Sequence, residues 1–87
     1  NRFSSSGELN FTVSDASKCI EKVQNHFASS AVSTDQLDGL SMSFDTWRFN
    51  LRKSNTEPLV RLNIETRGDH VLLQEKTNEL ELLIKHP

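Results

Sequence analysis

Residues 40–69 read LSMSFDTWRFNLRKSNTEPLVRLNIETRGD, and this stretch decides the fold. Apolar and polar side chains alternate along it in three successive segments. A period of two is typical of antiparallel strands that bury one face and leave the other polar. Asp45–Thr46 predicts a tight turn between the first two segments, and residues 53–58 predict a loop before the third. The apolar positions are Leu40, Met42, Phe44, then Trp47, Phe49, Leu51, then Val60, Leu62 and Ile64.

The flanking sequence predicts one more strand and two helices. Residues 9–13 alternate in the same way and indicate a short strand. Residues 15–28 carry apolar side chains at helical spacing, with Ser14 as the expected N-cap. A second amphipathic helix follows Asp69 and runs to about Lys85. The polar residues 29–39 between the first helix and the strands predict a connection that could hold one brief strand.

The order of elements predicts a two-layer α+β domain in which two helices cover one face of a four-stranded antiparallel sheet. Residues 1–7 are small, polar and turn-forming, which is typical of an interdomain linker. We therefore expect the linker at 1–7 and the folded domain at 8–87.

Composition narrows the function classes. A chain of 87 residues has room for one core, and its net charge of -2 argues against general nucleic-acid binding. Cys19 is the single cysteine, so no internal disulfide is possible and a cytoplasmic location is expected. No apolar run reaches the length of a membrane span. Cys19 and Trp47 fall on apolar stripes and are expected in the core, while the three histidines are too scattered for a metal site.

The densest chemical cluster lies in the predicted hairpin between the last two strands. Two arginines near its ends would share the polar face, and a planar guanidinium matches two phosphate oxygens at once. Hydroxyl and amide side chains in the loop add donors, and loop backbone amides could form an anion nest. The sequence therefore suggests a phosphate clamp. Its candidates are Arg52, Ser54, Asn55, Thr56 and Arg61, with Lys53 and Glu57 as supporting residues.

Two other interpretations remain open on chemistry alone. The loop composition also fits an ordinary polar turn, with Arg61 paired to Glu57 or Glu65. Alternatively, the arginines and Lys53 could form a small basic patch for RNA or a phosphopeptide, although no exposed aromatic ladder supports that. Glu57 is interpreted as a partner of Arg52 or Arg61 in either case.

A resemblance favours the clamp. The signature Arg-x-Ser-Asn/Gly-Thr-Glu-Pro-x-x-Arg is matched by residues 52–61, and Ser6-Gly7-Glu8-Leu9-Asn10 is similar to the segment that leads into the same domain. On these motifs the chain resembles the C-terminal domain of the α-D-phosphohexomutases, most of all that of bacterial phosphomannomutases. The likeness spans nearly the whole chain.

The resemblance implies a TATA-box-binding-protein-like fold and a role in phosphosugar chemistry. Arg52, Ser54, Asn55 and Thr56 would bind the phosphate that is not being transferred, with Arg61 as a helper. The implied enzyme interconverts mannose 6-phosphate and mannose 1-phosphate; a phosphoglucomutase, a phosphoglucosamine mutase or a free-standing phosphate- or RNA-binding module are alternatives. The implied partners are a mannose or glucose phosphate and other domains of the same chain, with no nucleic acid or membrane. Its catalytic serine and Mg²⁺ belong to those other domains, so this domain binds no cofactor and alone should be inactive.

Overall fold

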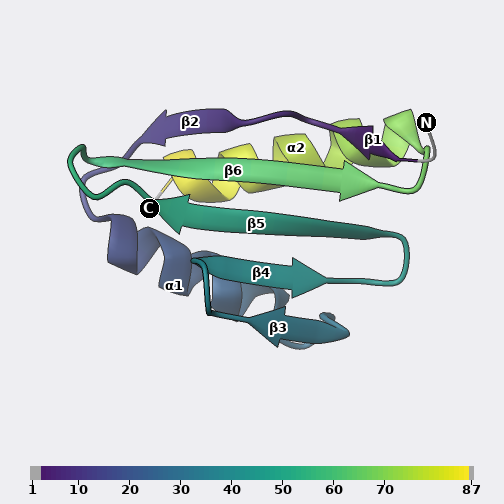
Figure 1. Cartoon of the computed structure of the whole chain (residues 1–87), viewed down its shortest axis with the longest axis horizontal. Coiled ribbons are helices and arrows are strands. Elements are labelled where there is room, and N and C mark those ends of the chain that lie inside the picture. The colour runs from purple at the N-terminus through teal and green to yellow at the C-terminus, as the bar shows by residue number, and fades with distance from the viewer. Residues whose placement is uncertain (1–2, 87) are drawn as a thin grey trace.

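The computed structural model describes residues 3–86, and it has the predicted α+β architecture (Figure 1). Asn1 and Arg2 of the expected linker, and Pro87 at the end of the expected domain, lie outside the described residues. The elements in chain order are β1 (Ser4–Ser5), β2 (Leu9–Thr12), α1 (Ala16–Phe27), β3 (Ser33–Asp35), β4 (Leu40–Ser43), β5 (Trp47–Lys53), β6 (Leu59–Thr66) and α2 (His70–Lys85).

The strands form one antiparallel sheet in the order β1-β6-β5-β4-β3, and β2 also pairs with β6, beside β1. All four predicted strands are present. Two further strands are short: β1, within the expected linker, was not predicted, and β3 is the one brief strand allowed for in the connection at 29–39. They have two and three residues, too few for alternation to be recognised in the sequence.

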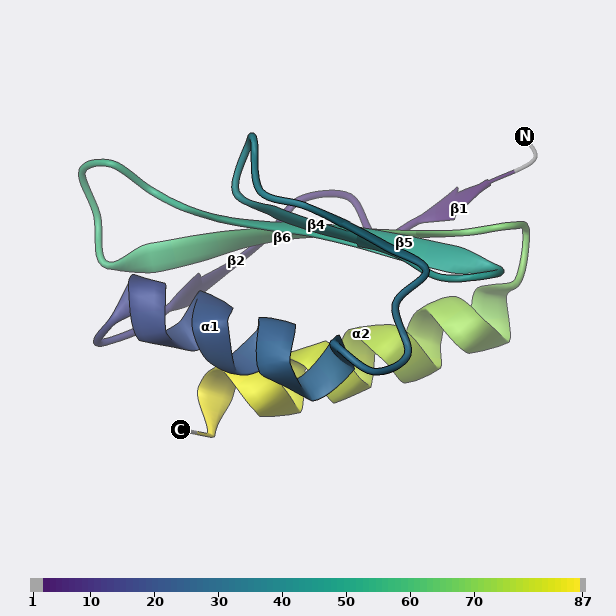
Figure 2. The same cartoon turned by 90° about the horizontal axis from the view of Figure 1, so that it is seen from below.

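Both helices lie on the same face of the sheet, as predicted, and leave the opposite face open (Figure 2). Asp69 caps α2, its carboxylate accepting a hydrogen bond from the Leu72 amide at 2.9 Å. The prediction of Ser14 as the cap of α1 is wrong, because Asp15 accepts the equivalent bond from Lys18 at 3.0 Å. An Asp one residue later serves equally well, since its carboxylate also suits the positive end of the helix dipole.

The core lies between the sheet and the helices. Its central side chains come from the apolar positions of β5 and β6, and Leu51, Leu62 and Ile64 are fully buried. Cys19 and Trp47 are buried at its border, as predicted. The Trp47 ring stacks on Phe44 with a centroid distance of 4.1 Å, and the Lys76 ammonium lies over the same indole. These contacts account for the burial of the Trp47 ring.

Candidate functional site

The two arginines of the predicted clamp lie side by side. Arg52 on β5 and Arg61 on β6 are direct cross-strand partners. Their neighbours Leu51 and Leu62 are buried against the helices, so alternation puts both arginines on the open face. Their side chains are 43% and 37% exposed, which leaves the guanidinium groups accessible to a ligand.

Two loops make this end of the open face concave. The β5–β6 loop, residues 54–58, and the β3–β4 turn, residues 36–39, both rise above the sheet on the side away from the helices (Figure 2). The concavity between them measures about 710 Å³. It brings together Arg52, Lys53, Ser54, Asn55, Thr56 and Arg61, with Ser17, Ile20, Asp38 and Gly39 also in its wall. We refer to Arg52, Ser54, Asn55, Thr56 and Arg61 as the clamp.

Ser54 organises the loop of the clamp. Its hydroxyl oxygen accepts hydrogen bonds from the backbone amides of Thr56 and Glu57, both at 3.3 Å. A serine hydroxyl has two acceptor lone pairs and one proton to donate. Because these two amides use the acceptor sites, the hydroxyl proton stays available for an anion.

The backbone amides of this loop give little support to the suggested anion nest, because three of them already donate within the domain. Besides the two amides held by Ser54, the Ser54 amide itself donates to the Leu59 carbonyl at 3.1 Å. The αR–αL form of nest also needs a residue in the left-handed region, and among the described residues only glycines, none of them in this loop, have positive φ. Side chains rather than loop amides therefore supply most of the donors.

Carboxylates from outside the hairpin neutralise the two arginines. Glu8 contacts both guanidinium groups, at 3.7 Å from Arg52 and 3.6 Å from Arg61, and Asp38 lies 3.8 Å from Arg52. The prediction that Glu57 pairs with either arginine is wrong, because Glu57 is exposed and, among the described residues, the carboxylates within 4 Å of the two arginines are those of Glu8 and Asp38. Glu65, the other suggested partner of Arg61, binds Arg48 at 2.7 Å.

The sequence analysis missed Glu8, Asp38 and Gly39. Gly39 has φ +73°, and a Cβ there would lie 2.6 Å from Arg52 Cβ. Glycine thus allows the β3–β4 turn to approach β5 directly beside Arg52. The available signals were Gly7-Glu8 and Asp38-Gly39, each an acidic residue next to a turn-forming glycine.

The Lys53 side chain points to the opposite face of the sheet from those of Arg52 and Arg61. It pairs with the buried Val60 across the hairpin, so its side chain extends toward the helix layer. There the ammonium donates to the Ser17 hydroxyl of α1 at 3.4 Å. Lys53 therefore borders the concavity from the side of α1, away from Arg52 and Arg61.

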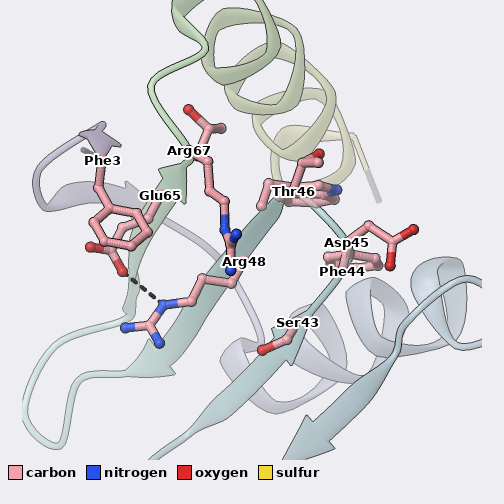
Figure 3. Close-up of a pocket in the computed structure, with 10 residues that line it drawn as sticks. Phe3, Ser43, Phe44, Asp45, Thr46, Arg48, Glu65 and Arg67 are labelled. Atoms are coloured by element: carbon pink, nitrogen blue, oxygen red, sulfur yellow. Dashed lines mark hydrogen bonds and ion pairs between the residues drawn. The ribbon is translucent and has the colours of Figure 1, made fainter.

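A second hollow of about 390 Å³ lies at the other end of the sheet (Figure 3). Figure 3 shows Arg48 bound to Glu65, with Phe3 beside the carboxylate and Arg67 extending toward Arg48. This hollow contains no residue of the clamp. Arg48, one of the two arginines that line it, is engaged by a short ion pair with Glu65 and therefore provides a comparison for the clamp arginines.

Residues 3–86 give little support for a reactive cysteine, a metal site or a membrane-spanning helix. Burial raises the pKa of the Cys19 thiol, with Lys22 opposing it weakly, so this cysteine is a protonated core residue. No three His, Cys, Asp or Glu side chains gather where a metal ion could bind, so these residues do not fit the magnesium site that the resemblance implies for the whole enzyme. Neither helix in this part of the chain is long and apolar enough to cross a membrane.

The fold and site define a two-layer α+β domain that carries an arginine- and hydroxyl-bearing hairpin at one end of its sheet. Residues 8–82 match the family described as the C-terminal domain of phosphoglucomutase/phosphomannomutase. The chain belongs to this family.

Relatives agree with this assignment. The chain is 51% identical over 82 residues to the phosphomannomutase of Salmonella montevideo, covering 94% of this chain and 18% of that protein. It is 49% identical to the "Phosphohexose mutases" of Xanthomonas campestris, covering 97% of this chain and 19% of the relative. It thus spans less than a fifth of these relatives' length. A crystal structure of a Burkholderia thailandensis phosphoglucomutase/phosphomannomutase family protein superposes with a TM-score of 0.68 at 26% identity, covering 95% of this chain and 18% of that one.

Proposed function

We propose that this domain binds the phosphate group of a phosphosugar within a longer phosphomannomutase, an isomerase that interconverts mannose 6-phosphate and mannose 1-phosphate. The observation that carries the proposal is the pairing of Arg52 with Arg61 directly across β5 and β6, beside a loop of hydroxyl and amide side chains. Two like charges facing each other across a sheet are unfavourable, which is understandable where an anion must be held.

Each group of the clamp has a distinct task in this proposal. The guanidinium groups provide paired N–H donors and positive charge for the phosphate oxygens. The Ser54 hydroxyl donates its free proton, and Thr56 and Asn55 add one hydroxyl and one amide donor. Such a set recognises the anion and not the sugar, so it could hold a phosphate at either end of the substrate.

The contribution to the reaction would be positional. Phosphoryl transfer depends mainly on alignment and charge stabilisation, and a fixed far-end phosphate orients the hydroxyl or phosphate that reacts. The reacting serine and the magnesium site expected from the resemblance would belong to other parts of a longer chain, as would a choice between sugars. We expect no mutase activity from the 87-residue chain alone.

We propose a mannose phosphate as the substrate, ahead of a glucose or glucosamine phosphate, because several relatives that are about 50% identical are named phosphomannomutase. By the family resemblance, Asn55 also argues against a phosphoglucosamine mutase, in which glycine is usual at that place. An RNA-binding role is disfavoured because Glu8, Asp38 and Glu65 pair with arginines of the open face and reduce its positive charge.

The decisive experiment is a chimera in which this chain replaces the matching segment of the Salmonella typhimurium phosphomannomutase, its 51% identical relative. We expect mutase activity with mannose 1-phosphate. Arg52→Ala should lower kcat/KM about 10- to 100-fold, since a hydrogen bond to a charged group contributes about 1.5–3 kcal/mol.

Arg48→Ala is the matched control, because Arg48 lies on the same open face but pairs with Glu65 in the second hollow. It should leave kcat/KM close to that of the unsubstituted chimera. Equal losses in the two variants, or wild-type kinetics with Arg52→Ala, would refute the clamp.

A further inference from the structure

We infer that Glu8 is a positioning residue of the clamp: its carboxylate holds Arg52 and Arg61 together in the absence of phosphate and competes with the phosphate that takes its place. This inference rests on the proposed function, since it assigns an internal counter-ion to the same site. The regular pairing of the edge strands with β6 is broken just before Glu8.

The edge of the sheet contains a β-bulge at Gly7. Ser5 pairs with Glu65 and Leu9 pairs with Leu62, so three residues, 6–8, face the two residues 63 and 64. Ser6 stays paired, because its amide donates to the Ile64 carbonyl and the Ile64 amide donates to the Ser6 hydroxyl, both at 2.9 Å. Gly7, with φ +68°, is therefore the extra residue, and a left-handed glycine is typical of one class of bulge.

The bulge determines which way Glu8 points. Ser4 on β1 is buried toward α2, where its hydroxyl lies 3.4 Å from His70 Nδ1. In an unbroken strand Glu8 would share that face, because side chains alternate with a period of two. The extra residue reverses the alternation, so Glu8 faces the open side of the sheet and its carboxylate reaches both clamp arginines.

The ion pairs of Glu8 are loose. At 3.6–3.7 Å they are longer than a charge-assisted hydrogen bond, which is about 2.7–2.9 Å. Arg48 and Glu65, on the same face, do reach 2.7 Å. Among the described residues neither clamp guanidinium donates a side-chain hydrogen bond, so their N–H groups remain available for a ligand. Glu8 thus offsets the repulsion between the arginines while leaving their donors free.

A phosphate dianion would need the same two guanidinium groups. It carries more charge than the carboxylate and has the geometry for paired hydrogen bonds, so it should displace Glu8. The displaced carboxylate stays attached to β2 nearby and continues to oppose the anion. Phosphate binding is then an exchange of one anion for another. Its affinity is lower than the two arginines would give without a carboxylate beside them.

The test is a titration of the 87-residue chain with inorganic phosphate, followed by amide and arginine Nε NMR signals. Glu8→Gln should bind phosphate about three- to tenfold more tightly, because one nearby negative charge is removed from a partly exposed site. It should also shift the Arg52 and Arg61 Nε signals before phosphate is added and lower the thermal midpoint. Glu65→Gln is the matched control and should leave phosphate affinity unchanged.

The outcomes separate this inference from the proposed function. If wild type binds phosphate at the clamp and Glu8→Gln binds it no more tightly, the competing role of Glu8 is refuted while the clamp stands. A merely structural Glu8 would give the reverse sign, with lower stability and weaker binding together. If neither protein shows phosphate-dependent shifts at Arg52 and residues 54–56, the clamp and the role of Glu8 are both overturned.

Discussion

Single residues beside the clamp are under tighter constraint than their positions in loops suggest. Gly39 packs so closely against Leu51 and Arg52 of β5 that a Cβ at Gly39 would lie 2.6 Å from Arg52 Cβ. Ser54 uses its hydroxyl to tie down the loop that carries Asn55 and Thr56. The donors of the clamp are therefore positioned by two small residues, one on each side of Arg52.

Gly39→Ala should destabilise the domain by about 1–3 kcal/mol, because the new methyl group would overlap Arg52 Cβ and Leu51 O and also strain the positive φ. Urea denaturation measures the loss. Gly7→Ala is the control, since φ is also positive there but nothing lies within 4 Å of its added Cβ. A loss from Gly39→Ala no larger than that from Gly7→Ala would show that the turn relaxes away from Arg52.

Among the elements, the helices depend on contacts with each other as well as with the sheet. Glu79 of α2 accepts from His26 of α1 at 3.0 Å and from Lys76 at 3.1 Å. Partial burial alone would raise the pKa of Glu79, but these hydrogen bonds and charges outweigh it and lower the pKa below its ordinary value. The ionised carboxylate therefore stabilises the folded pair of helices.

The sign of the pH effect follows from that lowered pKa. The contribution of Glu79 is present above the pKa of an unfolded glutamate, about 4.3, and is lost as the pH falls through the lower folded value. Glu79→Gln should thus be less stable than wild type at pH 6, with the gap closing toward pH 3. Urea denaturation at both pH values checks this. Glu81→Gln, which removes only an exposed pair with Lys85, should show a small gap throughout.

The boundaries of the strands and helices show which elements the local sequence pattern is enough to predict. The alternation in β4, β5 and β6 predicted those strands closely, and Asp69 correctly marked the start of α2. β1 was not identified, and β3 was allowed for only as a brief strand without bounds, because each is too short to show a period and its pairing depends on a neighbouring strand edge. The predicted cap of α1 was Ser14 and the observed cap is Asp15, because either side chain is able to accept the hydrogen bond from a first-turn amide.

At the scale of the whole molecule, β6 joins the two halves of the sheet. It pairs with β1 and β2 on one side and β5 on the other, and its inward residues reach the middle of the core. The same strand presents Arg61 on the opposite face. Stability and the clamp thus share one element, so damage to the core of β6 will also remove the site.

Leu62→Ala should destabilise the domain by about 2–5 kcal/mol, since Leu62 is fully buried and its loss leaves a cavity. Small domains have only about 5–15 kcal/mol in total, so this variant should be largely or wholly unfolded in moderate urea. Leu82→Ala, at a position 60% exposed, is the control and should change stability by about 0.5 kcal/mol or less. Similar denaturation midpoints for the two variants would contradict the assigned core.

By itself the sequence determined the α+β class, the four longer strands, both helices and the hairpin that carries Arg52 and Arg61. Those features depend on periods of two and 3.6 residues, which the backbone imposes locally and which the order of apolar and polar side chains reveals directly. Only the tertiary structure decided which charges face the arginines. Glu8 and Asp38 are distant in sequence from Arg61 and Arg52 respectively, and their positions depend on strand register, the bulge at Gly7 and the close turn at Gly39. A one-residue change in register reverses the face of a side chain, so ion pairs of this kind cannot be read from spacing along the chain.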